Sequence, residues 1–512
     1  MRQIYFKNVI LGYMTPIRKT AAELDSEAKI ILQNIHAAGD SLKMKDKLAL
    51  PPQPMPELEP AVRIHSMDEV AIGYTEAQAI AEASRCLNCK NPTCVSNCPV
   101  HMHIPEFIAE IAKGDFKAAF EKITEDSLLP AVCGRVCPQE RQCQKACTVG
   151  KCRKDQHECV SIGRLERFVA DYTRTHNLSE TPSVKPDTGK RVAVIGSGPA
   201  GLVVAADVRR EGHAVTVFEA YHKLGGVMRY GIPEFRLPKK IIDHETETLR
   251  AMGVEFKMNF TLGETRTLAQ LLNEDKFDAV FIGTGANQPL LMNIGGENLA
   301  GVFTAKEYLM RANALREKDA SACADWAGKD VAVLGGGNVA MDASRMALRL
   351  GAKRVRIIYR RTEKEMPACC SEIYEAHEEG IEVCELQCPS KILSDAGGHV
   401  RGLLIDKYKL GEPDEKGRPR PVKLEGQSFE TECDTVLLAI GSRADGLPEK
   451  DAPELKTDAK GNIRIADPAT NGTFMDRVFA GGDAVLGPAT VILAMGEGRR
   501  AAAGINAQLS KE

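Results

Sequence analysis

The chain contains 512 residues, of which 43% are hydrophobic and 27% are charged, a balance typical of globular proteins. One hydrophobic core rarely serves so long a chain, so about three or four domains are expected. Basic and acidic residues almost cancel to a formal net charge of −3, so no polyanion-binding surface is implied and nucleic acid is not expected as a partner.

The N-terminal residues do not form a secretory signal, and no apolar run reaches membrane-spanning length. A cytoplasmic protein without membrane association is therefore expected. Residues 1–60 form an extension with helical character over 20–36 and a stiff, proline-rich linker at 51–56. We interpret this extension as a packing or docking arm.

Cysteines dominate the next segment, because ten of the 16 cysteines lie between residues 86 and 159. They form two runs, spaced C-x2-C-x4-C-x3-C and C-x3-C-x5-C-x3-C: Cys86, Cys89, Cys94 and Cys98, then Cys133, Cys137, Cys143 and Cys147. In a reducing compartment, clustered cysteines bind metal more often than they form disulfides. Two groups of four thiols match the ligand demand of two [4Fe–4S] clusters.

Structural zinc is the alternative, because C-x2-C pairs also bind zinc. Iron–sulfur clusters are favoured because two nucleotide-binding units follow, and because Cys98 precedes a proline, as in ferredoxin runs. We expect a helical domain over residues 61–180, with a capping box at Thr75 opening the helix that leads to the first run. Cys152 and Cys159 follow the second run and are expected to be free surface thiols, with a small extra metal site as the alternative.

A strand pattern from residue 191 leads into a first glycine loop of the form G-x-G-x-x-G: Gly196, Ser197, Gly198, Pro199, Ala200 and Gly201. Such a loop lets the backbone approach a pyrophosphate at a helix N-terminus. Glu219 ends the next strand, where an acid bonds ribose hydroxyls, and the pair Gly225 and Gly226 follows.

A segment near the C-terminus completes the flavin prediction. Gly482 and Asp483 end a strand, where the acid can bond the ribityl chain. Thr490 then opens a helix whose positive end would stabilise reduced flavin. Together with Glu219, this segment predicts FAD as the ligand of the first loop.

A second strand pattern, from residue 330, leads into a loop of the form G-x-G-x-x-A: Gly335, Gly337, Asn338, Val339 and Ala340. The following strand ends in Arg360 and Arg361, where an NADH site carries an acid. A guanidinium pairs with a 2′-phosphate, so NADPH is preferred over NADH. Strand ends at 281–285 and at 438–441, including Gly441, mark two crossings between the nucleotide units.

The predicted fold is α/β, with two Rossmann-like dinucleotide-binding domains preceded by a helical iron–sulfur domain. The NADPH domain, residues 301–440, is expected to be inserted in the FAD domain. The FAD domain then comprises residues 181–300 and 441–512.

Four motifs, in this order, resemble the family of the small (β) subunit of NADPH-dependent glutamate synthase: Arg85-Cys-Leu-Asn-Cys, Cys98-Pro, Cys133-Gly-Arg-Val-Cys-Pro and Ile162-Gly-Arg-Leu-Glu-Arg-Phe. A similar module occurs in the large subunit of NADH-dependent ferredoxin:NADP oxidoreductase and in the N-terminal part of dihydropyrimidine dehydrogenase. The resemblance covers residues 60 to 505, approximately.

The resemblance implies a ligand set for each cluster. One cluster would be held by four thiols: Cys86, Cys89, Cys94 and Cys147. The other would be held by three thiols and one carboxylate: Cys98, Cys137, Cys143 and Glu166. By this resemblance Cys133 would not be a ligand, although the spacing of the second run alone would count it as one. The resemblance also implies that Arg236 binds FAD.

The expected function is to pass hydride from NADPH to FAD and single electrons through two [4Fe–4S] clusters to a larger redox subunit, with ferredoxin as another acceptor. We name no catalytic side chain, because the cofactors carry the chemistry. A glutamate synthase small subunit is favoured. The alternatives are the large subunit of an electron-bifurcating ferredoxin:NADP oxidoreductase and a relay subunit of a hydrogenase or dehydrogenase. Each implies a hetero-complex or oligomer.

Overall fold

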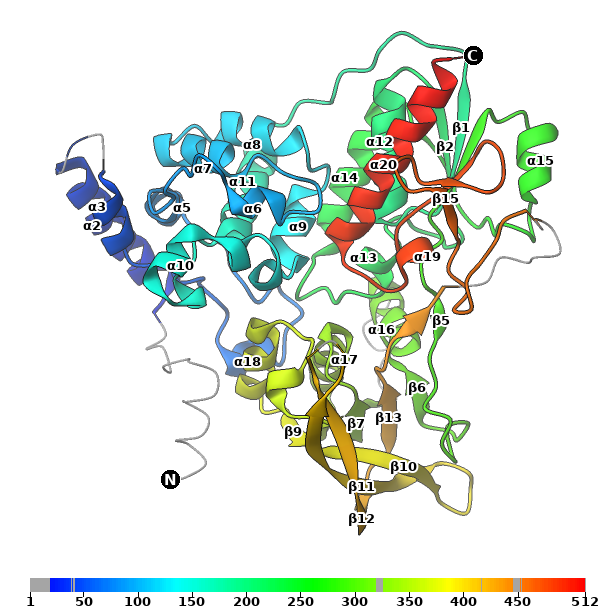
Figure 1. The fold of residues 1–512 in the computed structure, drawn as a ribbon. Helices are drawn as coiled ribbons and strands as arrows, with labels where there is room; N and C mark the ends of the chain where they lie inside the picture. Colours follow the sequence, from blue (N-terminus) through cyan, green and yellow to red (C-terminus); the bar gives the residue numbers. More distant parts are fainter. Residues whose placement is uncertain are drawn as a thin grey trace.

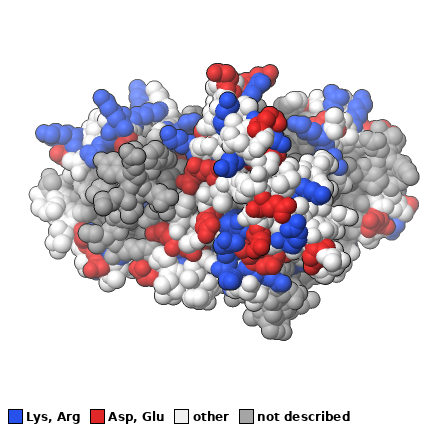
Figure 2. Space-filling model, turned by 90° about the horizontal axis from the view of Figure 1, so that it is seen from below, with Lys and Arg blue, Asp and Glu red and all other residues white. Residues whose placement is uncertain are grey.

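The computed structural model describes residues 19–37, 39, 42–318, 326–415, 417–444, 452 and 454–511, without the side chains of 315–318. Figure 1 shows a helical region beside two α/β units, each built on its own sheet. On the face drawn in Figure 2, basic and acidic side chains are interspersed over the coloured surface, in keeping with the small net charge. No helix within these ranges is both long and apolar enough to cross a membrane.

The helical region comes first (blue to cyan in Figure 1) and is divided into short helices by the cysteine loops. Thr75 opens α5 by the predicted capping box, because its hydroxyl accepts a hydrogen bond from the Gln78 amide at 3.3 Å. The elements are α2 (Ala21–Ala37), α3 (Met44–Ala49), α4 (Pro60–Arg63), α5 (Glu76–Ala83), α6 (Thr93–Ser96), α7 (Ile104–Lys113), α8 (Phe116–Thr124), α9 (Pro130–Val136), η1 (Gln139–Arg141), η2 (Gln144–Ala146), α10 (Thr148–Arg153), η3 (Gln156–Glu158) and α11 (Ile162–Thr175).

The first α/β unit has the described strand order β15-β16-β17-β4-β1-β2-β3, with parallel pairing from β17 to β3. Strands far apart in the sequence meet in it, since β17 pairs with β4. Its elements are β1 (Arg191–Ile195), α12 (Pro199–Arg210), β2 (Ala214–Phe218), α13 (Val227–Tyr230), α14 (Lys239–Ala251), β3 (Glu255–Lys257), α15 (Leu268–Asn273), β4 (Ala279–Ile282), β15 (Ile465–Asp467), β16 (Gly472–Thr473), β17 (Val478–Ala480), α19 (Asp483–Leu486) and α20 (Val491–Leu509).

The second unit has the described parallel order β6-β13-β7-β8-β9 and carries an antiparallel sheet, β10-β11-β12, that the sequence patterns did not indicate. Its elements are β6 (Val302–Thr304), α16 (Ala305–Lys318), β7 (Asp330–Leu334), α17 (Asn338–Arg349), β8 (Arg354–Tyr359), η5 (Glu363–Glu365), α18 (Cys370–Glu378), β9 (Glu382–Glu385), β10 (Gln387–Ser394), β11 (Val400–Pro413), β12 (Pro419–Glu432) and β13 (Thr435–Leu438).

Two chain segments join the units, β5 (Gln288–Pro289) and β14 (Ser442–Arg443), which pair antiparallel. The second unit therefore interrupts the first, and the predicted fold class is confirmed. The hydrophobic core of the helical region continues into the first unit, since Phe107, Phe168, Leu202 and Ile505 belong to one buried cluster. The cysteine loops are thus fixed against the first unit.

Candidate functional site

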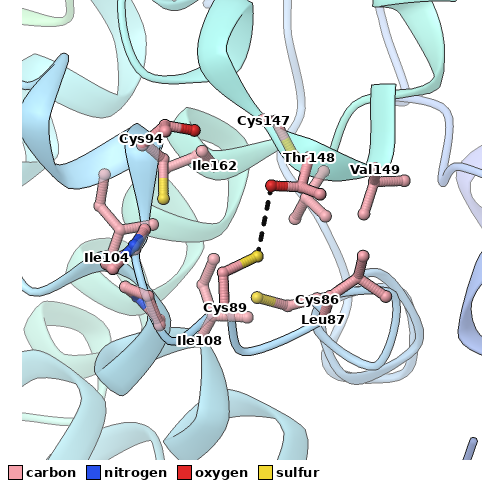
Figure 3. A pocket seen from close by; sticks show the side chains of 14 residues that line it. Cys86, Leu87, Cys89, Cys94, Ile104, Ile108, Cys147, Thr148, Val149 and Ile162 are labelled. Atoms are coloured by element: carbon pink, nitrogen blue, oxygen red, sulfur yellow. Dashed lines mark hydrogen bonds between the residues drawn. The ribbon is translucent and has the colours of Figure 1, made fainter. Parts of the chain in front are cut away.

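Four cysteines of the two runs line one pocket, in which Figure 3 shows their thiols. Three come from the first run and one from the end of the second: Cys86, Cys89, Cys94 and Cys147. Apolar side chains form much of the wall, among them Ile104 and Ile162. The thiol of Cys89 also contacts the Thr148 hydroxyl at 3.3 Å.

The electrostatics of this cavity disfavour free thiolates. Burial raises the pKa of Cys86 to about 11 and that of Cys94 to about 12. Cys147 is the exception, because a hydrogen bond from Cys159 lowers its pKa to about 6. Soft thiols in an apolar cavity become thiolate ligands when a cationic metal core displaces their protons, so the donor set fits an iron–sulfur cluster.

A second group brings together Cys98, Cys137, Cys143 and Glu166. The pKa of Cys143 is raised mainly by burial, and further by the negative charges of Cys98 and Glu166. The hydrogen bond with Cys133, followed by burial, raises the pKa of Cys137. Burial also raises the pKa of the Glu166 carboxyl to about 8. These groups fit a cluster held by three thiolates and one carboxylate.

Cys133 is buried beside this second group, and its thiol donates to the Met495 sulfur at 3.5 Å. Cys133 also hydrogen-bonds with Cys137, one of the expected ligands. That Cys133 is not itself a ligand therefore stays a prediction. In the described part of the chain, no group of three or more His, Cys, Asp and Glu side chains is arranged to hold a single metal ion. The four thiols of the first site, Cys86, Cys89, Cys94 and Cys147, surround a cavity instead.

One expectation about the cysteines is wrong. Cys152 is exposed, as predicted for a free surface thiol, but Cys159 is only 3% exposed. The Cys159 sulfur lies 3.1 Å from the Gln144 carbonyl oxygen and also neighbours Cys147, so its single proton can be donated to either of them. Gly150 provides the space, since a Cβ there would lie 2.4 Å from the Cys159 sulfur.

The first glycine loop joins β1 to α12, with Gly198 as the N-cap of the helix. Its close packing requires glycine at position 201, because a Cβ there would lie 1.9 Å from the Gly196 carbonyl oxygen. The Glu219 carboxylate accepts from the Ser197 amide at 2.9 Å and from the Ser197 hydroxyl. The acid after β2 is therefore held directly at the loop.

Two other segments lie against this loop. A Cβ on Gly226 would lie 3.0 Å from the Gly198 Cα, so the Gly225–Gly226 turn touches the loop. A Cβ on Gly482 would lie 3.0 Å from the Cβ of Ala200, so the closing segment touches it too. Burial raises the pKa of the Asp483 carboxyl, which follows, to about 6.

The helix α20 connects the closing segment to the cysteine region. Its N-cap is Thr490, whose hydroxyl accepts from the Leu493 amide at 3.3 Å. Further along the helix, a Cβ on Gly496 would lie 3.0 Å from the Pro99 carbonyl oxygen, and Pro99 follows Cys98. The backbone of α20 therefore contacts the residue that follows Cys98 in the chain.

The second glycine loop joins β7 to α17. Gly335 has a φ of +142°, and a Cβ there would lie 2.3 Å from the Ala439 carbonyl oxygen. The Asn338 side chain accepts from the Cys369 amide at 2.8 Å. Val339 is 48% exposed, whereas Ala340 is buried where α17 packs on the sheet.

The two arginines after β8 differ in environment. Arg360 is exposed, whereas Arg361 is buried and its Nε donates to the Pro419 carbonyl at 2.8 Å. An unpredicted third arginine, Arg418, is exposed in the hairpin and donates to the Tyr359 hydroxyl at 3.3 Å. Nothing in its local sequence indicates this position, which depends on the pairing of β11 with β12.

Arg236 and Gly441 lie where the two units meet. The Arg236 guanidinium donates to the Asp342 carboxylate at 2.7 Å and pairs with Glu372 at 2.9 Å, so it contacts α17 and α18. Its contact with FAD stays a prediction. Gly441, with a φ of +107°, lies just before β14, and its carbonyl accepts from the Leu290 amide at 3.0 Å.

Two family models match the chain. The model for dihydropyrimidine dehydrogenase domain II, with a 4Fe–4S cluster, matches residues 63–178, and the model for pyridine nucleotide-disulphide oxidoreductases matches residues 190–498. Among solved structures, FprA from Mycobacterium tuberculosis in complex with NADPH has a TM-score of 0.53 at 20% identity, over 64% of this chain and 85% of that chain. This likeness supports the fold alone.

Two Escherichia coli proteins are more similar in sequence. The putative oxidoreductase AegA is 37% identical over 472 residues, which are 90% of this chain and 71% of that protein. The small chain of NADPH-dependent glutamate synthase is 37% identical over 444 residues, 85% of this chain and 93% of that protein. The chain is therefore an oxidoreductase and belongs to the family of the glutamate synthase [NADPH] small chain.

Proposed function

We propose that this protein is an electron-input subunit that oxidises NADPH and delivers electrons to a larger redox partner. In this proposal it is the small subunit of a glutamate synthase. When bound, FAD at the first glycine loop would accept hydride from NADPH at the second loop, and two [4Fe–4S] clusters would carry single electrons onward. The names of the relatives support both the nicotinamide substrate and the subunit role.

The residues divide among four binding sites, two for clusters, one for FAD and one for NADPH. The first cavity would hold one cluster through Cys86, Cys89, Cys94 and Cys147, and the second group would hold the other through Cys98, Cys137, Cys143 and Glu166. The first loop, Glu219 and Asp483 would bind FAD. Arg360 would bind the 2′-phosphate of NADPH, because an exposed guanidinium at the end of this strand suits a phosphate.

The position of α20, which contacts both the first glycine loop and the residue after Cys98, is the observation that carries this proposal. A Cβ on Gly498 would lie 2.6 Å from the Ala200 carbonyl oxygen of the first glycine loop, and one on Gly496 would lie 3.0 Å from the Pro99 carbonyl oxygen. Electron transfer depends on short separation between carriers, and a glycine at position 496 permits that close approach. Three of the four cysteines at the first cavity, Cys86, Cys89 and Cys94, are partly exposed, so this is the cluster site that would face the partner.

Cofactor analysis of anaerobically purified protein tests the proposal. We expect about one FAD and about eight irons per chain, with reduction of both cofactor types by NADPH. Zinc in place of iron, or clusters that NADPH does not reduce, would contradict it. Purification from the native cell should recover a larger flavin or iron–sulfur subunit, whereas the absence of a bound subunit would refute the subunit role.

A further inference from the structure

The segment 366–370 lies directly on the second glycine loop. The Ala368 amide donates to the Gly336 carbonyl at 3.1 Å, and the Cys369 amide donates to the Asn338 side chain at 2.8 Å. A Cβ on Gly336 would lie 3.0 Å from Met366 Cγ. Any displacement of the loop on binding a pyrophosphate is therefore passed to this segment.

The other side of the same segment is held by the loop that carries Cys137 and Cys143. The guanidinium of Arg141 donates to three successive carbonyls of the segment at 2.7 to 3.2 Å, those of Met366, Pro367 and Ala368. The neighbouring Glu140 carboxylate accepts from the Cys370 amide at 3.1 Å. Two adjacent side chains thus join the cysteine loop to the nucleotide-binding unit.

The cysteine loop is itself fixed in place. The Gln139 side chain donates to the Cys133 carbonyl at 3.2 Å. It lies against Gly163, where a Cβ would come within 2.1 Å of the Gln139 amide nitrogen. Because the loop is tightly packed, a force on Glu140 or Arg141 reaches the backbone that positions Cys137 and Cys143.

We propose that Glu140 and Arg141 are positioning residues that couple nucleotide binding at the second glycine loop to the cluster held by Cys137 and Cys143. This inference rests on the proposed NADPH site and second cluster. Coupling between two sites is reciprocal, so the nucleotide shifts the potential of this cluster, and the oxidation state of the cluster changes nucleotide affinity by the same factor.

The test uses the holoprotein and 2′-phospho-ADP-ribose, which has the pyrophosphate and the 2′-phosphate but cannot accept hydride. Calorimetry gives its Kd, and redox titration followed by EPR gives the midpoint potential of each cluster with and without it. For about tenfold coupling, a size within the usual range, one cluster shifts by about 59 mV and the other does not.

Arg141→Met is expected to abolish both the shift and the roughly tenfold difference in Kd between oxidised and reduced protein. Arg141→Lys should be intermediate, because lysine keeps the charge but not the planar guanidinium that binds several carbonyls. Glu140→Ala gives an independent variant, since it leaves the arginine in place. Arg153→Met is the matched control: Arg153 is 40% exposed, as against 45% for Arg141, and donates to the Leu48 carbonyl at 3.1 Å. It should change neither quantity.

A purely structural contact would lower the melting temperature of Arg141→Met and Glu140→Ala while leaving Kd and the cluster shift intact, and that result would overturn the coupling. A wild-type protein that binds the probe without any cluster shift would overturn it too. If the wild-type protein does not bind the probe, the proposed NADPH site fails, and the coupling fails with it.

Discussion

Replacing Arg360 with serine tests the nucleotide preference most directly. Arg360 is exposed at the end of β8, whereas the side chain of Arg361 is committed to the Pro419 carbonyl. A hydrogen bond to a charged group contributes about 1.5–3 kcal/mol, which corresponds to roughly 10- to 150-fold in affinity. Screening of an exposed pair favours the lower end, so KM for NADPH should rise about tenfold.

The assay is steady-state reduction of ferricyanide with NADPH or NADH as the donor. KM for NADH should stay the same, because NADH lacks the 2′-phosphate. Arg354→Ser is the control, since Arg354 lies at the other end of β8 and pairs with Asp330. Equal changes in KM for both nucleotides would refute the reasoning, as would no change for NADPH.

Three further predictions concern the other cofactor sites. Cys159→Ala should lower the midpoint potential of one cluster by roughly 40 mV, because a hydrogen bond of about 1 kcal/mol to the Cys147 sulfur is lost; redox titration should show no such change in Cys152→Ala. Glu166→Ala should alter the EPR spectrum of one cluster only, and two unchanged spectra would point to a different ligand. Burial raises the folded-state pKa of Asp483 above its unfolded value to about 6, so the stability of flavin-free protein falls as pH rises from about 4 to about 6. Asp483→Asn should therefore raise the melting temperature of flavin-free protein at pH 7 but not below pH 4, while weakening FAD retention; equal melting temperatures at pH 7 would contradict this.

Local patterns predicted the parts of the fold that depend on near neighbours in sequence. The capping box at Thr75 and the strand that leads into Gly196 were both recognisable, because their hydrogen bonds or backbone turns involve residues a few positions apart. The insertion of one unit in the other was also predicted, since each crossing follows a buried strand, β4 or β13, with a glycine shortly after its end. The fold class was therefore predicted from motifs alone, and the sheets of the structure confirm it.

Features that depend on long-range packing were missed. The burial of Cys159 requires the space at Gly150 and the Arg85 guanidinium, which donates to the Cys159 carbonyl at 2.9 Å. No pattern around Cys159 reveals these partners. The ion pairs of Arg236 with Asp342 and Glu372 arise only when the two units pack together.

The antiparallel pairing of β5 with β14 has an evolutionary consequence. Since Ser442 lies opposite Pro289, the points where the chain enters and leaves the nucleotide-binding unit are neighbours, with Cα atoms about 5 Å apart. A gene rearrangement could therefore exchange this whole unit for another without breaking a strand of the flavin sheet. The unit that binds the electron donor can thus change in evolution while the unit and cysteine region that pass the electrons on stay the same.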